Sequence, residues 1–215
     1  MTATVPAVHL IRKAKQTEEY VLSGITEIDQ QIGGLPRGAI TEATGPLSSG
    51  KTTLLHSCLA WAASRLEHGA LIDTAGQFDP ATAARAGLNL GRLLWVRCDG
   101  DAGKALKAAD MILHAGGFGL VCLDLGGVDP RVLNRIPVSY WFRFRRAVES
   151  TPTSLLVLGD RPNARSCAAC WLEFTAPSPL WSGAPGFRLL RGATLRVSIH
   201  KPGRPRDLRL TARAA

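Results

Sequence analysis

The sequence predicts an α/β fold, with a mainly parallel β-sheet flanked by helices and a short antiparallel C-terminal extension. Short, nearly continuous apolar segments such as 154–158 alternate with helix-forming segments over most of the 215 residues. Strands that are apolar on both faces are typical of a parallel sheet that helices cover on both sides. From Cys167 onward, short strand-like segments are joined by Pro- and Gly-rich turns, which favours antiparallel pairing.

Helix and strand signals follow one another in a regular order. A basic N-terminal arm spans residues 1–20, the core spans residues 21–165, and a basic extension of the same domain spans residues 166–215. The expected helices are 23–32, with Ser23 as N-cap, 52–66, 80–86, 101–115 and 139–150. The expected strands are 38–44, 70–73, 93–97, 118–124 and 154–158 in the core, and 171–175, 187–190, 194–200 and 208–212 in the extension.

The most specific motif spans residues 45–52 and matches the phosphate-binding loop pattern G-x-x-x-x-G-K-[ST]. A strand-forming segment precedes it and a helix-forming segment follows it, which is the context that the motif requires. Lys51 is expected to reach the β- and γ-phosphates, and the Thr52 hydroxyl to complete the Mg²⁺ shell. With ATP and Mg²⁺ as cofactors, the expected nucleotide-binding residues are Gly45, Ser48, Ser49, Gly50, Lys51, Thr52, Thr53 and Asp79.

A carboxylate closes one of the apolar segments. Asp124 ends the run 120–124 and lies 73 residues after Lys51. In nucleotide-hydrolysing proteins with a phosphate-binding loop, a carboxylate at the end of such a strand holds the water shell of Mg²⁺. Thr52 and Asp124 are therefore the expected indirect Mg²⁺ ligands, and Asp124 is the candidate catalytic residue.

Charge is distributed unevenly along the chain, whose formal net charge is +9. Residues 1–130 hold 11 Lys and Arg against 13 Asp and Glu, whereas residues 131–215 hold 15 against 4. A basic half beside a near-neutral half indicates nucleic acid or an acidic protein partner, and a solubilising surface is the alternative.

Two further features limit the classes of function that the sequence allows. No apolar run approaches the roughly 20 residues that a membrane helix needs, and the first residues lack a signal-peptide pattern. We therefore expect a cytoplasmic protein without a membrane partner. Cys167 and Cys170 form an isolated C-x-x-C pair. Zinc would need two more ligands, so inert thiols are the simplest interpretation, with metal or redox chemistry as alternatives.

Residues 22–125 resemble a RecA-type ATPase core, which implies a RecA-like P-loop NTPase fold. The likeness rests, in order and spacing, on the segments 22–29, 33–38, 45–52, 71–80, 87–94 and 120–124. Recombinases of this type place a catalytic glutamate where this chain has Ala75, and a glutamine that senses the γ-phosphate where it has Gly159-Asp160-Arg161. Weak or absent ATP hydrolysis is expected, and an active DNA-dependent ATPase resembling a minimal recombinase is the alternative.

A shortened RecA-like chain with a reduced catalytic site is similar to the ImuA family of mutasome accessory proteins. The segments 87–97 and 195–204 carry this likeness. It implies DNA-damage-induced (SOS) translesion synthesis, with an ImuB-like Y-family polymerase homologue and a DnaE-type error-prone polymerase as partners. Self-association through the arm is the alternative assembly. A cell-division inhibitor of the same fold is a third interpretation, but it predicts no intact phosphate-binding loop.

Aromatic and arginine residues alternate in the segment 139–146. On a helix, Trp141, Phe144 and Val148 share one face, which indicates an amphipathic helix with solvated arginines. The RecA resemblance favours a DNA or partner surface instead. The candidate residues for binding single-stranded DNA are Arg143, Arg145, Arg146, Arg161 and Arg165, and Arg161 is also placed to reach a γ-phosphate. Arginines of the segment 204–213 either extend this patch or are dispersed along a strand.

Overall fold

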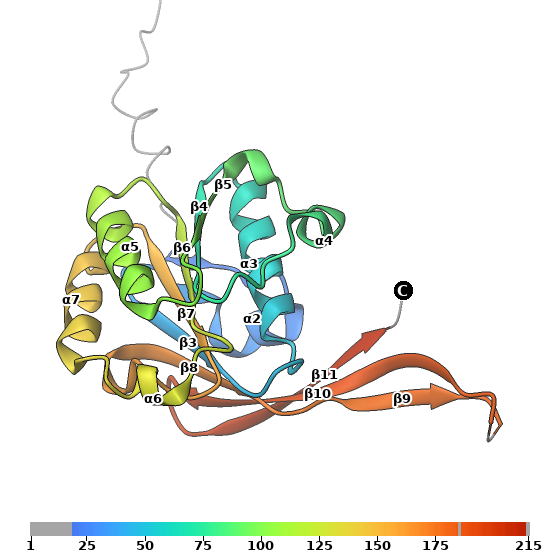
Figure 1. The fold of residues 1–215 in the computed structure, drawn as a ribbon. Helices are drawn as coiled ribbons and strands as arrows, with labels where there is room; N and C mark the ends of the chain where they lie inside the picture. Colours follow the sequence, from blue (N-terminus) through green and yellow to red (C-terminus); the bar gives the residue numbers. More distant parts are fainter. Residues whose placement is uncertain (1–18, 185, 214–215) are drawn as a thin grey trace, which may run out of the picture.

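A nine-stranded sheet forms the centre of the molecule (Figure 1). The computed structural model describes residues 19–184 and 186–213, and for Arg213 only the backbone. The strands are β3 (Ile40–Thr44), β4 (Gly69–Asp73), β5 (Leu93–Arg97), β6 (Leu120–Asp124), β7 (Ser154–Gly159), β8 (Ala168–Phe174), β9 (Ser178–Ser182), β10 (Leu189–Lys201) and β11 (Arg206–Arg213). Their order is β11-β10-β8-β3-β7-β6-β4-β5, and β9 pairs with β10.

Six neighbouring strands, from β8 to β5, run parallel to one another. Every residue of β3, β4 and β7 is buried, as are the first four residues of β6. β4, β6 and β7 are largely apolar on both faces, which suits the middle of a covered sheet, whereas β3 buries the polar residues Thr41, Glu42 and Thr44. The predicted fold class, a mainly parallel α/β sheet with an antiparallel element, is confirmed.

Helices cover both faces of the parallel strands. On one face lie α2 (Thr26–Ile32), α3 (Lys51–Ser64) and α4 (Pro80–Arg85), and on the other lie α5 (Ala102–Ala115), α6 (Pro130–Leu133) and α7 (Val138–Val148). Each set encloses its own buried cluster: Leu55 and Leu59 of α3 belong to the first, and Leu106 and Phe144 to the second. Two 3₁₀ turns, Leu90–Arg92 (η1) and Arg165–Cys167 (η2), complete the connections.

The amphipathic interpretation of the segment 139–150 is confirmed, since Trp141, Phe144 and Val148 of α7 are buried. The start of the first helix differs from the prediction. α2 begins at Thr26, with Ile25 at the N-cap position, so Ser23 does not cap it. The Asp29 carboxylate instead accepts hydrogen bonds from the backbone N–H groups of Ser23 and Gly24. That carboxylate closes the preceding turn in place of a serine cap.

A two-stranded sheet precedes β3. It consists of β1 (Tyr20–Val21) and β2 (Leu35–Pro36), which pair antiparallel. Apart from its last two residues, the predicted basic arm over residues 1–20 lies outside the described residues.

The C-terminal extension differs from the prediction in two respects. β8, which we expected to pair antiparallel, is parallel to β3. Residues 160–167 carry the chain back across the sheet, so that β8 starts beside Ile40 and runs in the same direction as β3. In addition, the second half of the predicted strand 187–190 and all of 194–200 belong to one strand, β10, which begins at Leu189. A bulge between Leu190 and Gly192 accommodates the glycine that suggested a turn.

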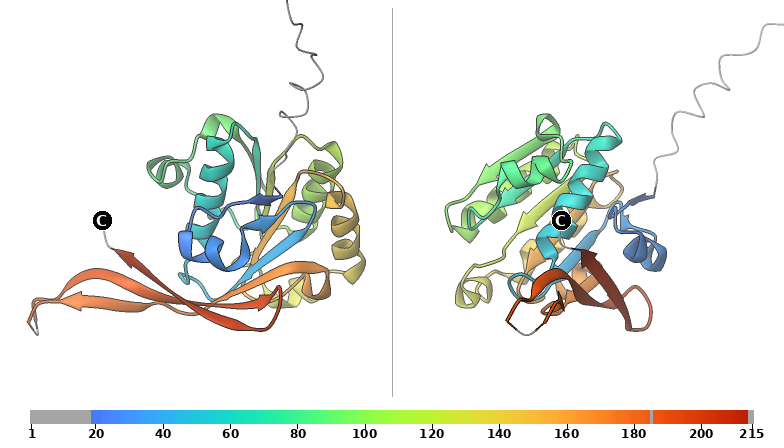
Figure 2. Two further views of the ribbon diagram at one scale, coloured as in Figure 1. Left: turned by 180° about the vertical axis from the view of Figure 1, so that it is seen from behind. Right: turned by 90° about the vertical axis from the view of Figure 1, so that its right-hand side faces the viewer.

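The antiparallel part of the sheet extends away from the body of the molecule (Figure 2). It consists of β9, β10 and β11, with β10 paired to each of the other two. β9 was not predicted, because its sequence Ser-Pro-Leu-Trp-Ser lacks a clear alternation and contains a proline. These three strands are called the ribbon below.

The described helices are all too short or too polar to cross a bilayer. The five cysteines are free thiols in buried positions. Burial raises the pKa of the Cys170 thiol to about 12, which disfavours the reactive thiolate. Within the described residues, no group of three His, Cys, Asp or Glu side chains is arranged to hold a metal ion.

Candidate nucleotide-binding site

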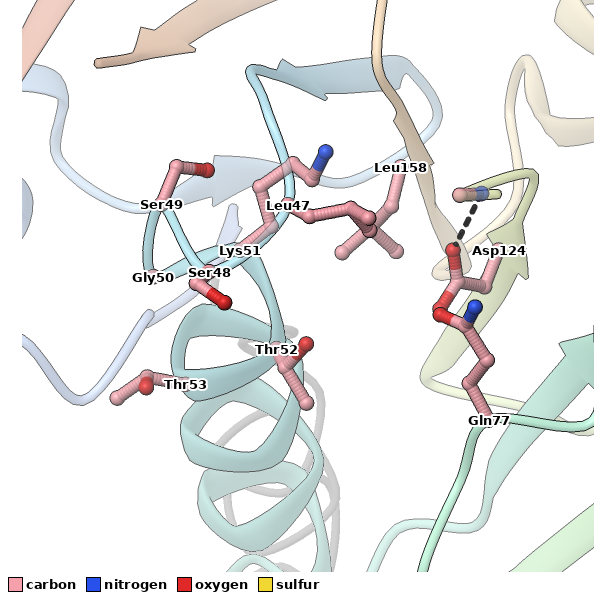
Figure 3. Close-up of a pocket in the computed structure, with 11 residues that line it drawn as sticks. Leu47, Ser48, Ser49, Gly50, Lys51, Thr52, Thr53, Gln77, Asp124 and Leu158 are labelled. Carbon is pink, nitrogen blue, oxygen red and sulfur yellow. Dashed lines mark hydrogen bonds between the residues drawn. The ribbon is translucent and has the colours of Figure 1, made fainter. Parts of the chain in front are cut away.

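The phosphate-binding loop connects β3 to α3 at the carboxyl edge of the parallel strands. It closes a hollow, called the phosphate hollow below, that is lined by residues 47–53, Gln77, Asp124, Gly126 and Leu158 (Figure 3). Gly45 has φ +148°, and a Cβ there would lie 2.3 Å from the Phe174 carbonyl oxygen. Gly50 has φ +102° and would meet a Leu195 methyl at 2.6 Å. Glycine suits these two positions, because any other residue would be strained at these φ values and would crowd Phe174 or Leu195.

Lys51 is buried, with 8% of its surface exposed. Its amino group donates hydrogen bonds to the carbonyl oxygens of Gly45 and Gly159, the latter at 3.1 Å. It also forms an ion pair with Asp160, 2.8 Å from Nζ to Oδ1. The carboxylate therefore takes the place of a phosphate as the counter-charge of the lysine. A nucleotide phosphate that binds Lys51 must compete with this ion pair.

Asp124 stands where the sequence predicts the carboxylate for Mg²⁺. It ends β6 beside Asp73 of β4 and lines the phosphate hollow together with Thr52. Its Oδ1 atom accepts a hydrogen bond from the Gly126 N–H at 2.8 Å. Burial raises the pKa of Asp124 above its usual range, and the neighbouring Asp73 adds to this while Lys51 opposes it. A bound cation would favour the charged form.

Gln77 is a polar residue of the site that the sequence interpretation missed. The Asp73 carboxylate accepts hydrogen bonds from three successive backbone N–H groups, those of Gly76, Gln77 and Phe78, at 2.8 to 3.1 Å. This turn carries the Gln77 side chain into the phosphate hollow, beside Asp124 (Figure 3). An aspartate at a strand end followed closely by glycine is the signal that could have indicated the turn. Ala75 lies within this turn and supplies no carboxylate.

Glu42 fixes the loop that carries Asp160. It is 1% exposed on β3, and its carboxylate accepts hydrogen bonds from the backbone N–H groups of Asn163, Ala164 and Arg165. Burial raises the pKa of Glu42, and these three N–H groups act in the opposite direction. The loop after β7 is thereby tied to the strand that leads into the phosphate-binding loop.

The remaining predicted residues occupy separate places. Asp79 is exposed and caps α4 by accepting hydrogen bonds from the Ala81 and Thr82 N–H groups. It does not line the phosphate hollow, so its predicted nucleotide contact stays a prediction. Arg161 and Arg165 line a second hollow together with Asp160.

The structure does not bring the arginines of α7 to the same place. Arg143 forms an ion pair with Asp110 of α5, and Arg143 and Arg146 line a groove between these helices. α7 ends next to Gly38, which precedes β3, whereas the phosphate-binding loop follows β3. The two groups of predicted DNA-binding arginines therefore line two separate hollows.

Residues 6–131, more than half of the chain, match the RecA N-terminal domain family. The chain belongs to the RecA family. It is 40% identical over 93 residues to the protein RecA of Chloroflexus aggregans, a match that covers 43% of this chain and 26% of that protein. It is 37% identical over 116 residues to the chloroplastic DNA repair protein recA homolog 1 of Arabidopsis thaliana, covering 53% of this chain and 26% of that protein.

The matched part thus spans about a quarter of these RecA relatives. In three dimensions, the chain is similar to the crystal structure of the RadB recombinase, with a TM-score of 0.67 over 90% of this chain and 95% of that chain. The identity is 18%, so this likeness supports the RecA-type fold and carries no statement about activity.

We predict that Asp160→Asn strengthens ATP binding on the order of tenfold. The substitution keeps the volume of the side chain but removes a charge that competes with phosphate for Lys51. The effect is modest because Asp160 is partly exposed and water screens the ion pair. Equilibrium titration with ATP measures the change. Asp99→Asn, which removes an exposed carboxylate beside Arg97, is the matched control. Unchanged or weaker ATP binding by Asp160→Asn would contradict the competition.

Proposed function

We propose that this RecA-family chain binds ATP with Mg²⁺ in the phosphate hollow. The observation that carries the proposal is the convergence of Lys51, Thr52 and Asp124 on one hollow at the start of α3. The N–H groups of the first turn of α3 have no acceptor within the helix and favour an anion there. The Ser49 hydroxyl is buried and has no hydrogen-bond partner in the described part of the chain, and a phosphate oxygen would satisfy it.

The residues of the site fit this cofactor. Lys51 would hold the β- and γ-phosphates, and Thr52 and Asp124 would hold the hydrated Mg²⁺. When bound, the ion would supply charge neutralisation between the phosphates. Gln77 would orient a water molecule near the γ-phosphate through its amide. An amide is a poor proton acceptor, so this chain would bind ATP more readily than it hydrolyses it.

We further propose that the protein acts in DNA repair as an accessory factor of damage-induced translesion synthesis. Three features support this role: membership of the RecA family, the absence of a glutamate at Ala75, and the ImuA-like segments 87–97 and 195–204. The partners would be an ImuB-like Y-family polymerase homologue and a DnaE-type error-prone polymerase. The predicted DNA-binding residues Arg161 and Arg165 line a hollow with Asp160, which is the ion-pair partner of Lys51.

Lys51→Ala is expected to weaken ATP binding by about 1.5–3 kcal/mol, because it removes a charge-assisted phosphate contact. Titration of the folded variant with ATP in the presence of Mg²⁺ measures this loss, and circular dichroism checks the fold. Lys104→Ala, on α5 away from the hollow, is the matched control and should bind ATP as the wild type does. A folded Lys51→Ala protein with unchanged ATP affinity would remove the nucleotide assignment.

ATP turnover distinguishes the accessory role from the alternative of a minimal recombinase. We expect turnover far below 1 s⁻¹, with or without single-stranded DNA, because the site has no general base at Ala75. Phosphate release at saturating ATP is the measurement, with the Lys51→Ala variant as the background control. Turnover that approaches about 1 s⁻¹ and is stimulated by DNA would support the recombinase instead.

The partner is tested by sedimentation at low salt with ATP. We expect the isolated chain to sediment as a small species and to shift when an ImuB-like protein is added, since an accessory factor acts within a complex. Long polymers of the isolated protein would instead support self-association of the recombinase type and contradict the accessory role.

A further inference from the structure

The ribbon has two faces of different character. Val197 and Ile199 of β10 belong to the same buried core cluster as Leu55 and Leu59 of α3, so their side chains point toward the body of the molecule. The alternate residues Arg196 and Ser198 therefore point to the opposite face, called the outer face below. Residues that pair directly across an antiparallel ladder share a face. The outer face thus also contains Thr194 with its two ladder partners, Ser178 and Thr211. It contains Arg196 with its partner Arg209 as well.

Two arginines oppose each other on this face. Arg196 and Arg209 are direct partners in the ladder between β10 and β11, and both are exposed. Like charges placed directly opposite each other are unfavourable. Neither guanidinium forms an ion pair or a hydrogen bond with any residue that the structure describes. The pair therefore has no direct ion-pair partner within that part of the protein. The carboxylates on the same face, Asp207 and Glu173, lie at the next ladder position opposite Ser198 and are bonded to Ser198 and His200.

Hydroxyl groups surround this pair. Thr175, Ser178 and Thr194 line a hollow together with Arg196 and Arg209. The Thr175 hydroxyl donates to the Arg196 carbonyl oxygen, which leaves two guanidinium groups and the hydroxyl groups of Ser178 and Thr194 as donors. This donor set suits a phosphate, since arginine forks bind phosphate oxygens in bidentate geometry. The residues 176–215 hold eight Lys and Arg against one Asp, so the surroundings of the hollow also favour an anion.

Positive charge and exposed aromatic surface continue from the hollow toward the outer end of the ribbon. Arg191 lies at the bulge of β10, and its Nε atom donates a hydrogen bond to the Ser182 hydroxyl at 2.7 Å. At the outer end, Phe187 is 87% exposed and Arg188 follows it. Five residues of extended strand separate Arg191 from Arg196, a distance of about 17 Å. This length suits several successive phosphates of an extended strand rather than one small anion.

We propose that the outer face of the ribbon binds single-stranded DNA. The phosphates occupy the Arg196–Arg209 hollow and follow the face to Arg191 and Arg188, and a base stacks on Phe187. Single-stranded nucleic acid is favoured because its bases are free to stack on an aromatic ring, whereas those of a duplex are already stacked with one another. The proposed DNA site is separate from the nucleotide site. The ribbon residue that contacts the phosphate-binding loop at Gly50 is Leu195, which lies on the inner face, opposite to the arginines.

The test compares paired variants in binding to a labelled oligothymidylate of roughly 20 nucleotides across a range of salt concentrations. The Arg196→Ala/Arg209→Ala double variant is expected to lower the log–log salt slope by about 1.4, from two phosphate contacts at about 0.7 each. That corresponds to a loss of affinity on the order of 25-fold at about 0.1 M salt. The matched control is Arg85→Ala/Arg97→Ala, which removes two exposed charges from α4 and β5 and should leave the slope unchanged.

The proposed stacking of a base on Phe187 is tested by a separate substitution. Phe187→Ala is expected to weaken binding roughly fivefold or more without changing the salt slope. Phe142→Ala on α7, which removes a half-exposed ring elsewhere, should have no effect. Duplex DNA and poly-glutamate are expected to bind more weakly than the oligothymidylate.

Three results would overturn the proposal. The first is no binding of the oligothymidylate at low salt by the wild type, and the second is equal binding of poly-glutamate, which would point to an acidic protein partner. The third is loss of binding in an Arg143→Ala/Arg145→Ala/Arg146→Ala variant together with full binding by the ribbon variant, which would place the DNA on α7. ATP titration of the same ribbon variants, with wild-type affinity expected, separates failure of this proposal from failure of the nucleotide assignment.

Discussion

The buried amino group of Lys51 sets the requirement that the rest of the site meets. A cation removed from water needs a counter-charge and hydrogen-bond acceptors, or it would lower the stability of the fold or lose its proton. Two backbone carbonyl groups and the Asp160 carboxylate meet this need. Any phosphate that binds here must replace the carboxylate as the partner of the lysine. Under the proposed function, the nucleotide affinity would thus be a difference between two ion pairs, and Asp160 would help to set its size.

The parallel register brings these groups together. Gly159 pairs with Thr44, the last residue of β3, and Leu158 pairs with Asp124, the last residue of β6. Three strand ends therefore meet at one edge, where the phosphate-binding loop, the Mg²⁺ carboxylate and the Asp160 loop emerge. The buried Glu42 carboxylate then fixes the Asp160 loop by its backbone. Ala75 supplies no carboxylate at this edge, but Lys51, Thr52 and Asp124 of the proposed nucleotide site line one hollow there.

Much of the core could be predicted from the sequence because its signals are local. The phosphate-binding loop, the buried strands and Asp124 follow from residue type and spacing over short stretches. Glu42 could not be found in this way, since its role depends on hydrogen bonds to the backbone of a distant loop. The turn at Gln77 has a local signal in Asp73 and Gly76, but the direction of the Gln77 side chain depends on the tertiary structure. The direction of β8 depends on the path of residues 160–167 across the sheet, which no periodicity encodes. The opposition of Arg196 and Arg209 likewise depends on the register between two strands.

The most direct test of the account is an equilibrium titration of the purified chain with ATP, with and without Mg²⁺. We expect one site per chain, whose affinity for ATP rises when Mg²⁺ is present, because Thr52 and Asp124 would contribute only through the ion. Absence of binding, or an ATP affinity that Mg²⁺ does not change, would contradict the assignment of Lys51, Thr52 and Asp124 to a single nucleotide site.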